Sequence, residues 1–186
     1  IVRAALVHYQ FETAHPFLDG NGRLGRLLIT LMLINDGVLH SCLFYPSFQF
    51  KKNQSEYYRQ LTSVRERGTY EEWIEFFCNS LLESAKDSVG SLKNLVDLHN
   101  RSTATITENL GRTAANGQRL LGIREEHPSV DTASIAAQLD IGRSTASSLV
   151  KSFEELGILR PLDESRQRYR QYGYEEYLSI LREDAE

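Results

Sequence analysis

The chain has 186 residues, of which 41% are hydrophobic and 25% charged, and its formal net charge at pH 7 is −4. These values are ordinary for a soluble globular protein, and the length has room for one domain of about 100 to 130 residues and a smaller second one. No apolar run approaches the ~20 residues needed to cross a bilayer, and no signal-peptide pattern opens the chain, so we expect a cytoplasmic protein without a membrane partner.

The start of the chain is predicted to be helical. Residues 1–13 show a helical spacing of apolar residues, and Pro16 then forces an exit from the helix. One face of this helix is expected to carry Val2, Leu6, Tyr9 and Thr13. Because the only methionine is Met32, we expect the chain to be an N-terminally truncated fragment.

The segment from His15 to Arg26 reads HPFLDGNGRLGR. Gly20 and Gly22 flank Asn21, so successive backbone N–H groups can turn inward and form a nest that holds an anion. A helical apolar pattern follows at once and is expected to stop near Gly37. The residues of that pattern lie on one helical face: Leu24, Leu27, Leu28, Leu31 and Met32. The nest is therefore predicted at a helix N-terminus, a place that holds phosphates.

Charged side chains surround the predicted nest. Arg23 and Arg26, three residues apart, share a face of the first helical turn. Asp19 offers a hard oxygen ligand, and a carboxylate beside bound phosphates is a common way to hold Mg²⁺. His15 has an intrinsic pKa suited to taking a proton from a hydroxyl near neutral pH.

This segment resembles the signature His-x-Phe-x-Asp/Glu-Gly-Asn-Gly-Arg-x-x-Arg of the Fic (filamentation induced by cAMP) family. It matches the signature at His15, Phe17, Asp19, Gly20, Asn21, Gly22, Arg23 and Arg26. The resemblance also extends through Lys51-Lys52-Asn53 and Tyr57-Tyr58 to residues 73–77. It implies a Fic-type helical bundle that transfers AMP from ATP to a Ser, Thr or Tyr hydroxyl of a target protein.

The resemblance also implies roles for single residues. His15 becomes the general base, Asp19 the Mg²⁺ ligand, and Phe17 a core anchor that fixes the loop. The implied nucleotide- and phosphate-binding residues are Asp19, Gly20, Asn21, Gly22, Arg23, Leu24, Gly25, Arg26, Tyr57 and Tyr58. For Tyr57 and Tyr58 a core position stays open as the alternative, because aromatic residues at helical spacing are often buried.

Two parts that many members of this family carry are not found in the sequence. One is a β-hairpin flap that aligns the target side chain. The other is an inhibitory helix whose Ser/Thr-x-x-x-Glu motif pairs with the second motif arginine, here Arg26. Residues 1–84 are therefore expected to form the C-terminal part of a Fic catalytic domain without flap or inhibitory helix.

The middle of the chain is predicted to be helical. Ser47–Arg67 reads as a helix ending near Gly68, and Tyr70–Leu82 as another. The buried side of the second is expected to carry Trp73, Ile74, Phe77 and Leu81. Residues 85–127 contain no Pro or Gly/Ser-rich run, so we expect a helical connector rather than a flexible linker.

The pattern changes from Pro128 onward. Asp131 is a good N-cap for a helix, residues 140–142 form a short turn, and a second helix follows that stops at Gly157. Inward positions are expected at Ile135, Ala136, Leu139, Ala146, Leu149, Val150, Phe153 and Leu156. Residues 158–162 and 169–174 then read as a two-stranded wing, and 175–183 as a last helix. Residues 128–186 thus resemble a winged helix-turn-helix domain, and the chain is predicted to be mainly α, with a small α+β second domain.

Two partners are open for this second domain. Polar side chains suited to phosphate contact are expected on the second helix (Arg143, Ser144, Thr145, Ser147, Ser148 and Lys151) and the wing (Arg166, Arg168 and Arg170). Residues 128–186 contain 7 Lys/Arg and 11 Asp/Glu, however, a net charge of 7 − 11 = −4. An acidic module binds DNA poorly without specificity, so a protein-docking or dimerising module is the alternative to a DNA-binding one.

The sequence therefore predicts a protein adenylyltransferase that uses ATP and Mg²⁺, with His15 as general base, and that could form a homodimer. One alternative is a DNA-binding regulator that senses a nucleotide without turning it over. Another is an enzyme that transfers a different phosphate-containing group or removes AMP. The motif specifies how phosphates are held and leaves the transferred group open.

Overall fold

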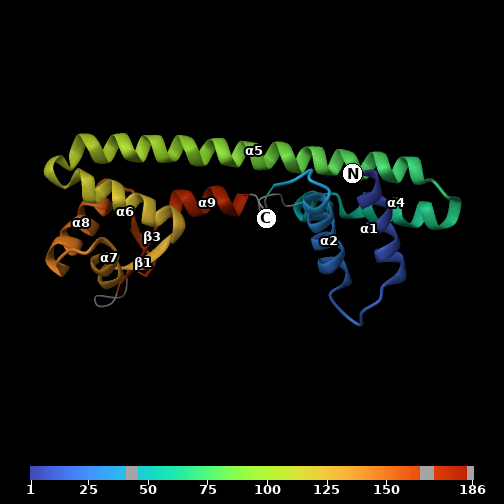
Figure 1. Cartoon of the computed structure of the whole chain (residues 1–186), viewed down its shortest axis with the longest axis horizontal. Helices are drawn as coiled ribbons and strands as arrows, with labels where there is room; N and C mark the ends of the chain where they lie inside the picture. Colours follow the sequence, from blue (N-terminus) through green and yellow to red (C-terminus); the bar gives the residue numbers. More distant parts are fainter. Residues whose placement is uncertain (41–45, 164–169, 184–186) are drawn as a thin grey trace. The chain divides into compact units, whose positions relative to one another are not determined.

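A computed structural model of the chain describes residues 1–40, 46–163 and 170–183. It is mainly helical with one small antiparallel sheet, which confirms the predicted fold class (Figure 1). The chain forms two compact units, residues 1–90 and residues 91–183, and the 40-residue helix α5 (Tyr70–Asn109) contributes to both. The predicted domain limits at residues 84 and 127 stay predictions. None of the described helices is long and apolar enough to span a membrane.

The first unit contains α1 (Val2–Ala14), α2 (Asn21–Asn35), α3 (Ser47–Lys52), α4 (Gln54–Arg67) and the first part of α5. The predicted helix 47–67 is interrupted at Asn53. The Asn53 side chain donates a hydrogen bond to the carbonyl of Gln49 (3.0 Å), a local bond that competes with a continuous helix. The predicted end at Gly68 is confirmed, because Gly68 adopts φ 70°, a left-handed conformation that ends helices.

Aromatic rings form the core of the first unit. Trp73 and Phe77 are fully buried, as predicted, and pack against Phe50 and Tyr57. The Trp73 indole N–H donates to the carbonyl of Ala5 (3.0 Å), which brings α1 close to α5.

The predicted apolar face of α1 is only partly right. Tyr9 is buried, but Val2 and Leu6 are exposed, and Ala4 and Ala5 lie inside instead. Small side chains fill these positions because the indole–carbonyl bond leaves little space between the helices.

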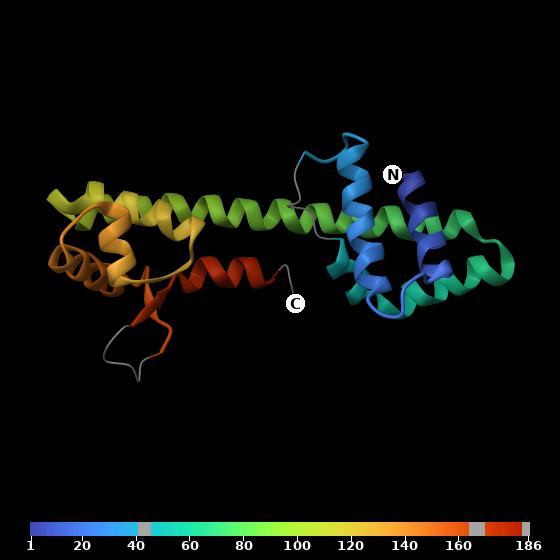
Figure 2. The ribbon, with the colours of Figure 1, turned by 60° about the horizontal axis from the view of Figure 1, so that its bottom comes forward.

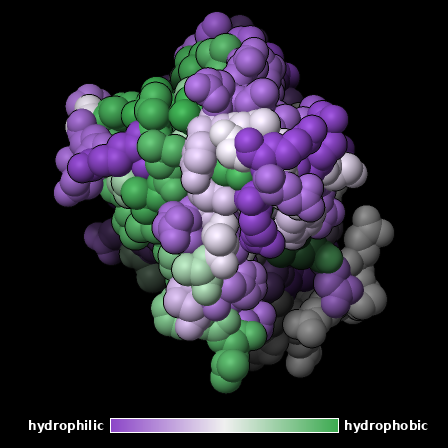
Figure 3. Space-filling view, turned by 90° about the vertical axis from the view of Figure 1, so that its right-hand side faces the viewer, coloured by the Kyte–Doolittle hydropathy of each residue, from purple (hydrophilic) through white to green (hydrophobic). Residues whose placement is uncertain are grey.

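The apolar face predicted for α2 also needs correction. The helix exists as expected, yet Leu24, Leu27 and Leu31 are exposed, and hydrophobic side chains remain on the surface of the first unit (Figure 3). The buried side carries Gly25, Ile29 and Leu33. Gly25 decides the orientation, because only a residue without a side chain lets α1 approach this closely.

His8 occupies the centre of the first unit. It is fully buried, and its Nδ1 lies 3.0 Å from the Gly25 carbonyl oxygen while its Nε2 lies 2.9 Å from the Tyr57 hydroxyl. The carbonyl oxygen can only accept, so Nδ1–H donates to it, and in the neutral ring Nε2 accepts from the tyrosine. Burial lowers the pKa of His8 to about 4. His8 is thus a satisfied structural histidine that ties α1 to α2 and α4.

The folding stability of the chain is predicted to fall as the pH drops from 6.5 towards 4. An unfolded chain protonates His8 below its ordinary pKa of 6.5, whereas the folded chain does so only near pH 4. The contribution of His8 to the free energy of unfolding is therefore fully present above pH 6.5. Below that pH it declines by roughly 1.4 kcal/mol per pH unit. Urea unfolding at several pH values, followed by the fluorescence of Trp73, the sole tryptophan, measures the slope of the free energy of unfolding against pH.

His8→Gln should flatten this slope between pH 6.5 and 5, where few carboxylates titrate. His40→Gln is the matched control, because His40 is exposed and its replacement should leave the slope unchanged. An equal slope in wild type and His8→Gln would contradict the assignment.

The second unit contains the end of α5, a short 3₁₀ turn (Gly111–Thr113), α6 (Ala114–Glu126), α7 (Thr132–Leu139), α8 (Arg143–Glu155) and α9 (Glu175–Glu183). The predicted helices are confirmed, and Asp131 caps α7 by accepting the backbone N–H of Ser134 at 2.8 Å. The predicted inward residues are buried, except that Leu156 is only half-buried.

Among the described residues, the sheet of the second unit has three short strands: β1 (Ser129–Asp131), β2 (Arg160–Pro161) and β3 (Gln171–Gly173). The central strand β3 pairs antiparallel with both others, and Val130 and Pro161 both lie opposite Tyr172. The wing strands were predicted, although they are shorter than expected. Strand β1 was not predicted, because three residues are too few to show the alternation of apolar and polar side chains that indicates a strand.

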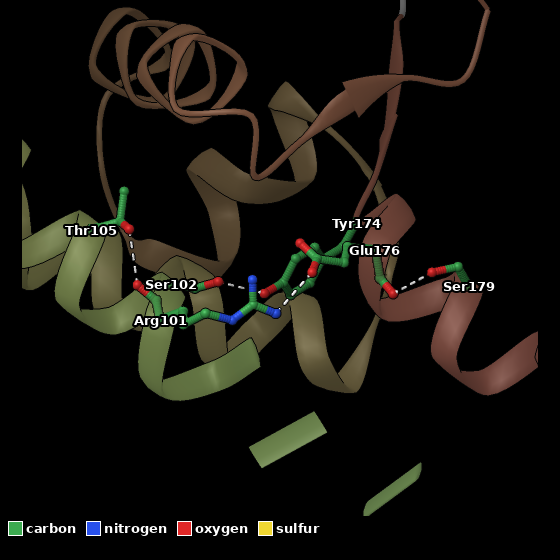
Figure 4. Close-up of polar contacts among 6 residues, drawn as sticks. All are labelled: Arg101, Ser102, Thr105, Tyr174, Glu176 and Ser179. Atoms are coloured by element: carbon green, nitrogen blue, oxygen red, sulfur yellow. Dashed lines mark hydrogen bonds and ion pairs between the residues drawn. The ribbon is translucent and has the colours of Figure 1, made fainter. Parts of the chain in front are cut away.

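Polar contacts join α5 to the end of the sheet (Figure 4). The hydroxyls of Ser102 and Tyr174 are 2.7 Å apart in a buried position, and Arg101 pairs with Glu176 at 2.9 Å. Burial raises the pKa of Tyr174 to about 12, so its phenol stays protonated at neutral pH.

Candidate functional site

The His15–Gly20 loop joins α1 to α2 at one end of the two helices (Figure 2). His15 adopts the left-handed conformation (φ 46°, ψ 57°), and its N–H caps α1 by donating to the Phe11 carbonyl at 3.0 Å. Gly20 is also left-handed (φ 79°), which turns the chain into α2. Two left-handed residues thus fix where the loop starts and ends.

The side chain of Asn21 holds the loop in shape. Its Oδ1 accepts the N–H of Phe17 at 2.9 Å, and its Nδ2 donates to the Phe17 carbonyl at 2.6 Å. Asn21 is only 2% exposed, whereas the Phe17 side chain is 52% exposed. The prediction that Phe17 anchors the loop in the core is therefore wrong. Its ring touches only the edge of the first unit, with its centroid 6.4 Å from that of Phe11, while its backbone is held by Asn21.

The start of α2 presents backbone N–H groups. The first hydrogen bond within the helix runs from Leu24 N–H to the Gly20 carbonyl (3.0 Å), so the amides of Asn21, Gly22 and Arg23 precede the helical ladder. The Gly20 N–H, in contrast, donates to Oδ1 of Asp19 at 2.6 Å. The nest was predicted from the amides of Gly20, Asn21 and Gly22, and that of Gly20 is already bound by Asp19. The amide of Arg23, like those of Asn21 and Gly22, precedes the helical hydrogen bonds and takes its place.

Both motif arginines fold back over the glycines at the start of α2. A Cβ atom added to Gly22 would lie 3.2 Å from Nη1 of Arg26, and one added to Gly20 would lie 3.7 Å from Nη2 of Arg23. The guanidinium groups and the helix amides therefore gather at one helix end, where positive charge favours an anion. The absence of a Cβ leaves room for this arrangement.

Asp19 and Arg23 form a loose, solvent-screened pair. Their charged atoms are 3.8 Å apart, and their side chains are 94% and 80% exposed. Such a pair contributes little to stability, so both groups can exchange it for a ligand.

Asp19 is also suited to the predicted Mg²⁺. The described residues contain no group of three or more His, Cys, Asp or Glu that could cage a metal. Mg²⁺ needs no such cage, since one carboxylate, substrate phosphates and water commonly hold it. The exposed carboxylate of Asp19 fits this role.

The predicted base, His15, is exposed, and its Nδ1 lies 3.4 Å from the Glu12 carbonyl oxygen. The ring stands at the end of α1, in the same loop as Asp19. It is thus open to solvent and accessible to a substrate hydroxyl.

The remaining predicted nucleotide-binding residues separate into different environments. Tyr57 is buried and donates to His8, so it occupies the core position left open as an alternative, and burial raises its pKa. Tyr58 and Leu24 are exposed. Gly25 is buried against α1, and its carbonyl accepts from His8. Tyr57 is therefore linked to the motif helix through His8.

In the second unit the polar face of α8 is exposed as predicted. Its members are Arg143, Ser144, Thr145, Ser147, Ser148 and Lys151. Lys151 lies 3.7 Å from Glu155 in an exposed ion pair. Arg170 is half-buried, and Arg166 and Arg168 lie outside the described residues.

Comparison with known proteins agrees with the geometry of the first unit. Residues 1–33, which hold α1, the loop and most of α2, match the profile of the Fic/DOC family. Residues 1–33 are thus similar to the Fic/DOC family. This stretch, residues 1–33, is called the Fic segment below. It contains every residue that the structure brings to the start of α2.

Curated relatives extend the similarity beyond the Fic segment. The protein adenylyltransferase fic-1 of Caenorhabditis elegans is 32% identical over 97 residues, which cover 52% of this chain and 18% of the relative. The protein adenylyltransferase Fic of Drosophila grimshawi is 33% identical over 76 residues, covering 41% of this chain and 14% of the relative. The chain therefore spans less than a fifth of the length of these relatives.

Gly25→Ala is predicted to destabilise the Fic segment. Its Cβ would overlap Oε1 of Glu12 and lie 3.1 Å from Cδ1 of Phe11, both on α1. Overpacking of this kind costs about 1–3 kcal/mol, visible as a lower midpoint of thermal unfolding.

Gly22→Ala is the matched control, since its Cβ would meet only the mobile end of Arg26. This variant should stay as stable as wild type while binding ATP more weakly in calorimetry. A larger loss of stability in Gly22→Ala than in Gly25→Ala would refute the packing argument.

Proposed function

We propose that this chain is part of a protein adenylyltransferase, which transfers AMP from ATP to a Ser, Thr or Tyr hydroxyl of a target protein. One observation carries the proposal: the guanidinium groups of Arg23 and Arg26 lie over Gly20 and Gly22, where the amides of α2 begin. Such an arrangement favours phosphates, and the named activity of the relatives supports ATP as the nucleotide.

In the proposed reaction the triphosphate binds at the start of α2. His15 takes the proton from the target hydroxyl as its oxygen attacks the α-phosphorus. The new oxygen–phosphorus bond forms, the bond to the β-phosphate breaks, and pyrophosphate leaves. The amides of residues 21–23 and the two arginines balance the charge that builds on the phosphates. Such charge stabilisation supplies most of the catalysis in phosphoryl transfer. Mg²⁺ held by Asp19 would neutralise further phosphate charge.

We predict that the chain labels a target protein, or itself, with α-labelled ATP and that His15→Ala removes the label. Loss of a general base lowers the rate by about 10² to 10⁴. Radiolabel incorporation measures the effect, with His40→Ala as a control because His40 is an exposed histidine elsewhere in the first unit.

Full labelling by His15→Ala would rule out His15 as the base. Mass spectrometry of the labelled protein distinguishes AMP from another phosphate-containing group. A mass shift other than that of AMP would keep the phosphate site and change the reaction.

A second candidate function is DNA binding by the second unit. It is favoured by the exposed polar face of α8, whose opposite face is buried and which follows α7 after a three-residue turn. In a winged helix such a second helix enters the major groove. The nucleotide site would then serve as a sensor.

If the second unit binds DNA, a gel shift should weaken in Arg143→Ala and Lys151→Ala and should weaken further as salt rises. Arg119→Ala on α6 is the control, because Arg119 is equally exposed but lies off α8. No salt-dependent shift, or equal effects of all three substitutions, would favour a protein-docking or dimerising module.

A further inference from the structure

A small cavity lies between α4 and the start of α5, within the first unit. Its volume is about 270 Å³, and every side chain that lines it is polar: Arg59, Gln60, Ser63, Arg67, Thr69 and Glu72. Pockets for drug-sized ligands hold about 300–1,000 Å³, so this cavity fits a single side chain rather than a nucleotide. The end of the first unit that carries the α4–α5 turn faces the viewer in Figure 3.

The wall of the cavity is held in place by hydroxyl groups. The oxygens of Ser63 and Thr69 are 2.7 Å apart, and Nη2 of Arg67 donates to the Ser63 oxygen at 2.8 Å. Ser63 is only 9% exposed. The Arg67 guanidinium is therefore positioned at the cavity by a hydroxyl group rather than by a carboxylate.

The second arginine of the cavity is already neutralised. Arg59 pairs with Glu56 through its Nε at 2.9 Å, and Gln60 donates to the other oxygen of the same carboxylate at 2.7 Å. These bonds hold the pKa of Glu56 below its ordinary value, the Gln60 bond most strongly. A guanidinium has five N–H donors, and the one bond found for Arg67 among the described residues leaves the others for a ligand.

The charges at the cavity favour a carboxylate over a phosphate. Arg59 and Arg67 are balanced by Glu56 and Glu72, so the surroundings are neutral overall and a doubly charged phosphate gains little. A planar carboxylate matches the fork of Arg67 with two parallel bonds. Glu72, on the α5 wall, is then an acceptor for an N–H group of the same ligand.

We propose that this cavity binds an acidic residue of a protein partner, with the carboxylate on Arg67 and a main-chain N–H on Glu72. Combined with the proposed function, it is a docking site for the target protein, remote in sequence from the Fic segment. The binding itself needs no nucleotide and no transfer activity.

The test is an NMR titration of the ¹⁵N-labelled chain with N-acetyl-glutamate N-methylamide. The backbone amide of Thr69 and the side-chain amide of Gln60 should shift and saturate. The glutamine analogue of this probe and inorganic phosphate serve as comparisons and should produce much smaller shifts. An equal response to the glutamine analogue would overturn the proposal, and a stronger response to phosphate would overturn the choice of a carboxylate.

Substitutions locate the binding. Arg67→Gln should weaken the binding of the glutamate probe about tenfold or more, because a charge-assisted hydrogen bond is lost. Arg65→Gln, in the same helical turn but outside the lining, should change it less than about twofold. Arg67→Lys keeps the charge without the fork and should give an intermediate loss.

Wild-type affinity in both Arg67 variants would overturn the proposal, as would an equal loss in Arg65→Gln. Because the titration does not use ATP, it can succeed where the labelling assay fails. The docking site and the transfer reaction are thus tested separately.

Discussion

The arrangement of the first unit depends on one buried imidazole. His8 connects the Gly25 carbonyl on α2 with the Tyr57 hydroxyl on α4, and burial keeps the ring neutral by lowering its pKa. Because Gly25 lies one turn into α2, this contact fixes the start of that helix against α1, while the hydrogen bonds between Asn21 and Phe17 fix the preceding loop. Donors held in place before a ligand arrives need no reorganisation when charge develops, which is the condition for electrostatic catalysis.

The helices of this chain could largely be predicted from its sequence, but their buried faces could not. The helix stop at Gly68 and the cap at Asp131 are local signals, and both hold in the structure. For α2 the leucine pattern indicated a face, yet the helix turns Gly25 inward because α1 approaches there. That approach is a tertiary contact, and one helix seen alone gives no sign of it. The break at Asn53 was missed for a related reason, since the competing side-chain bond depends on the local conformation.

The candidate site could be predicted as a set of residues, though not as an arrangement. The twelve-residue motif marks the segment that we propose binds phosphates. The hydrogen bonds between Asn21 and Phe17 depend on the loop conformation, however, and His8 gains its role only when three helices meet. A buried arginine was equally unforeseen. Arg124 is fully buried, its Nη2 reaches Gln138 at 3.5 Å, and burial lowers its pKa to about 10. Sequence patterns treat arginine as a surface residue.

The central claim is that the start of α2 is a preformed site for the phosphates of ATP. An NMR titration of the labelled chain with ATP tests it directly, because the amides of Asn21, Gly22 and Arg23 report on that helix end. We expect these three amides to shift together and to saturate, with the rest of α2 nearly unchanged. If they stay in place while ATP shifts amides elsewhere in the chain, the site is not where the structure puts it.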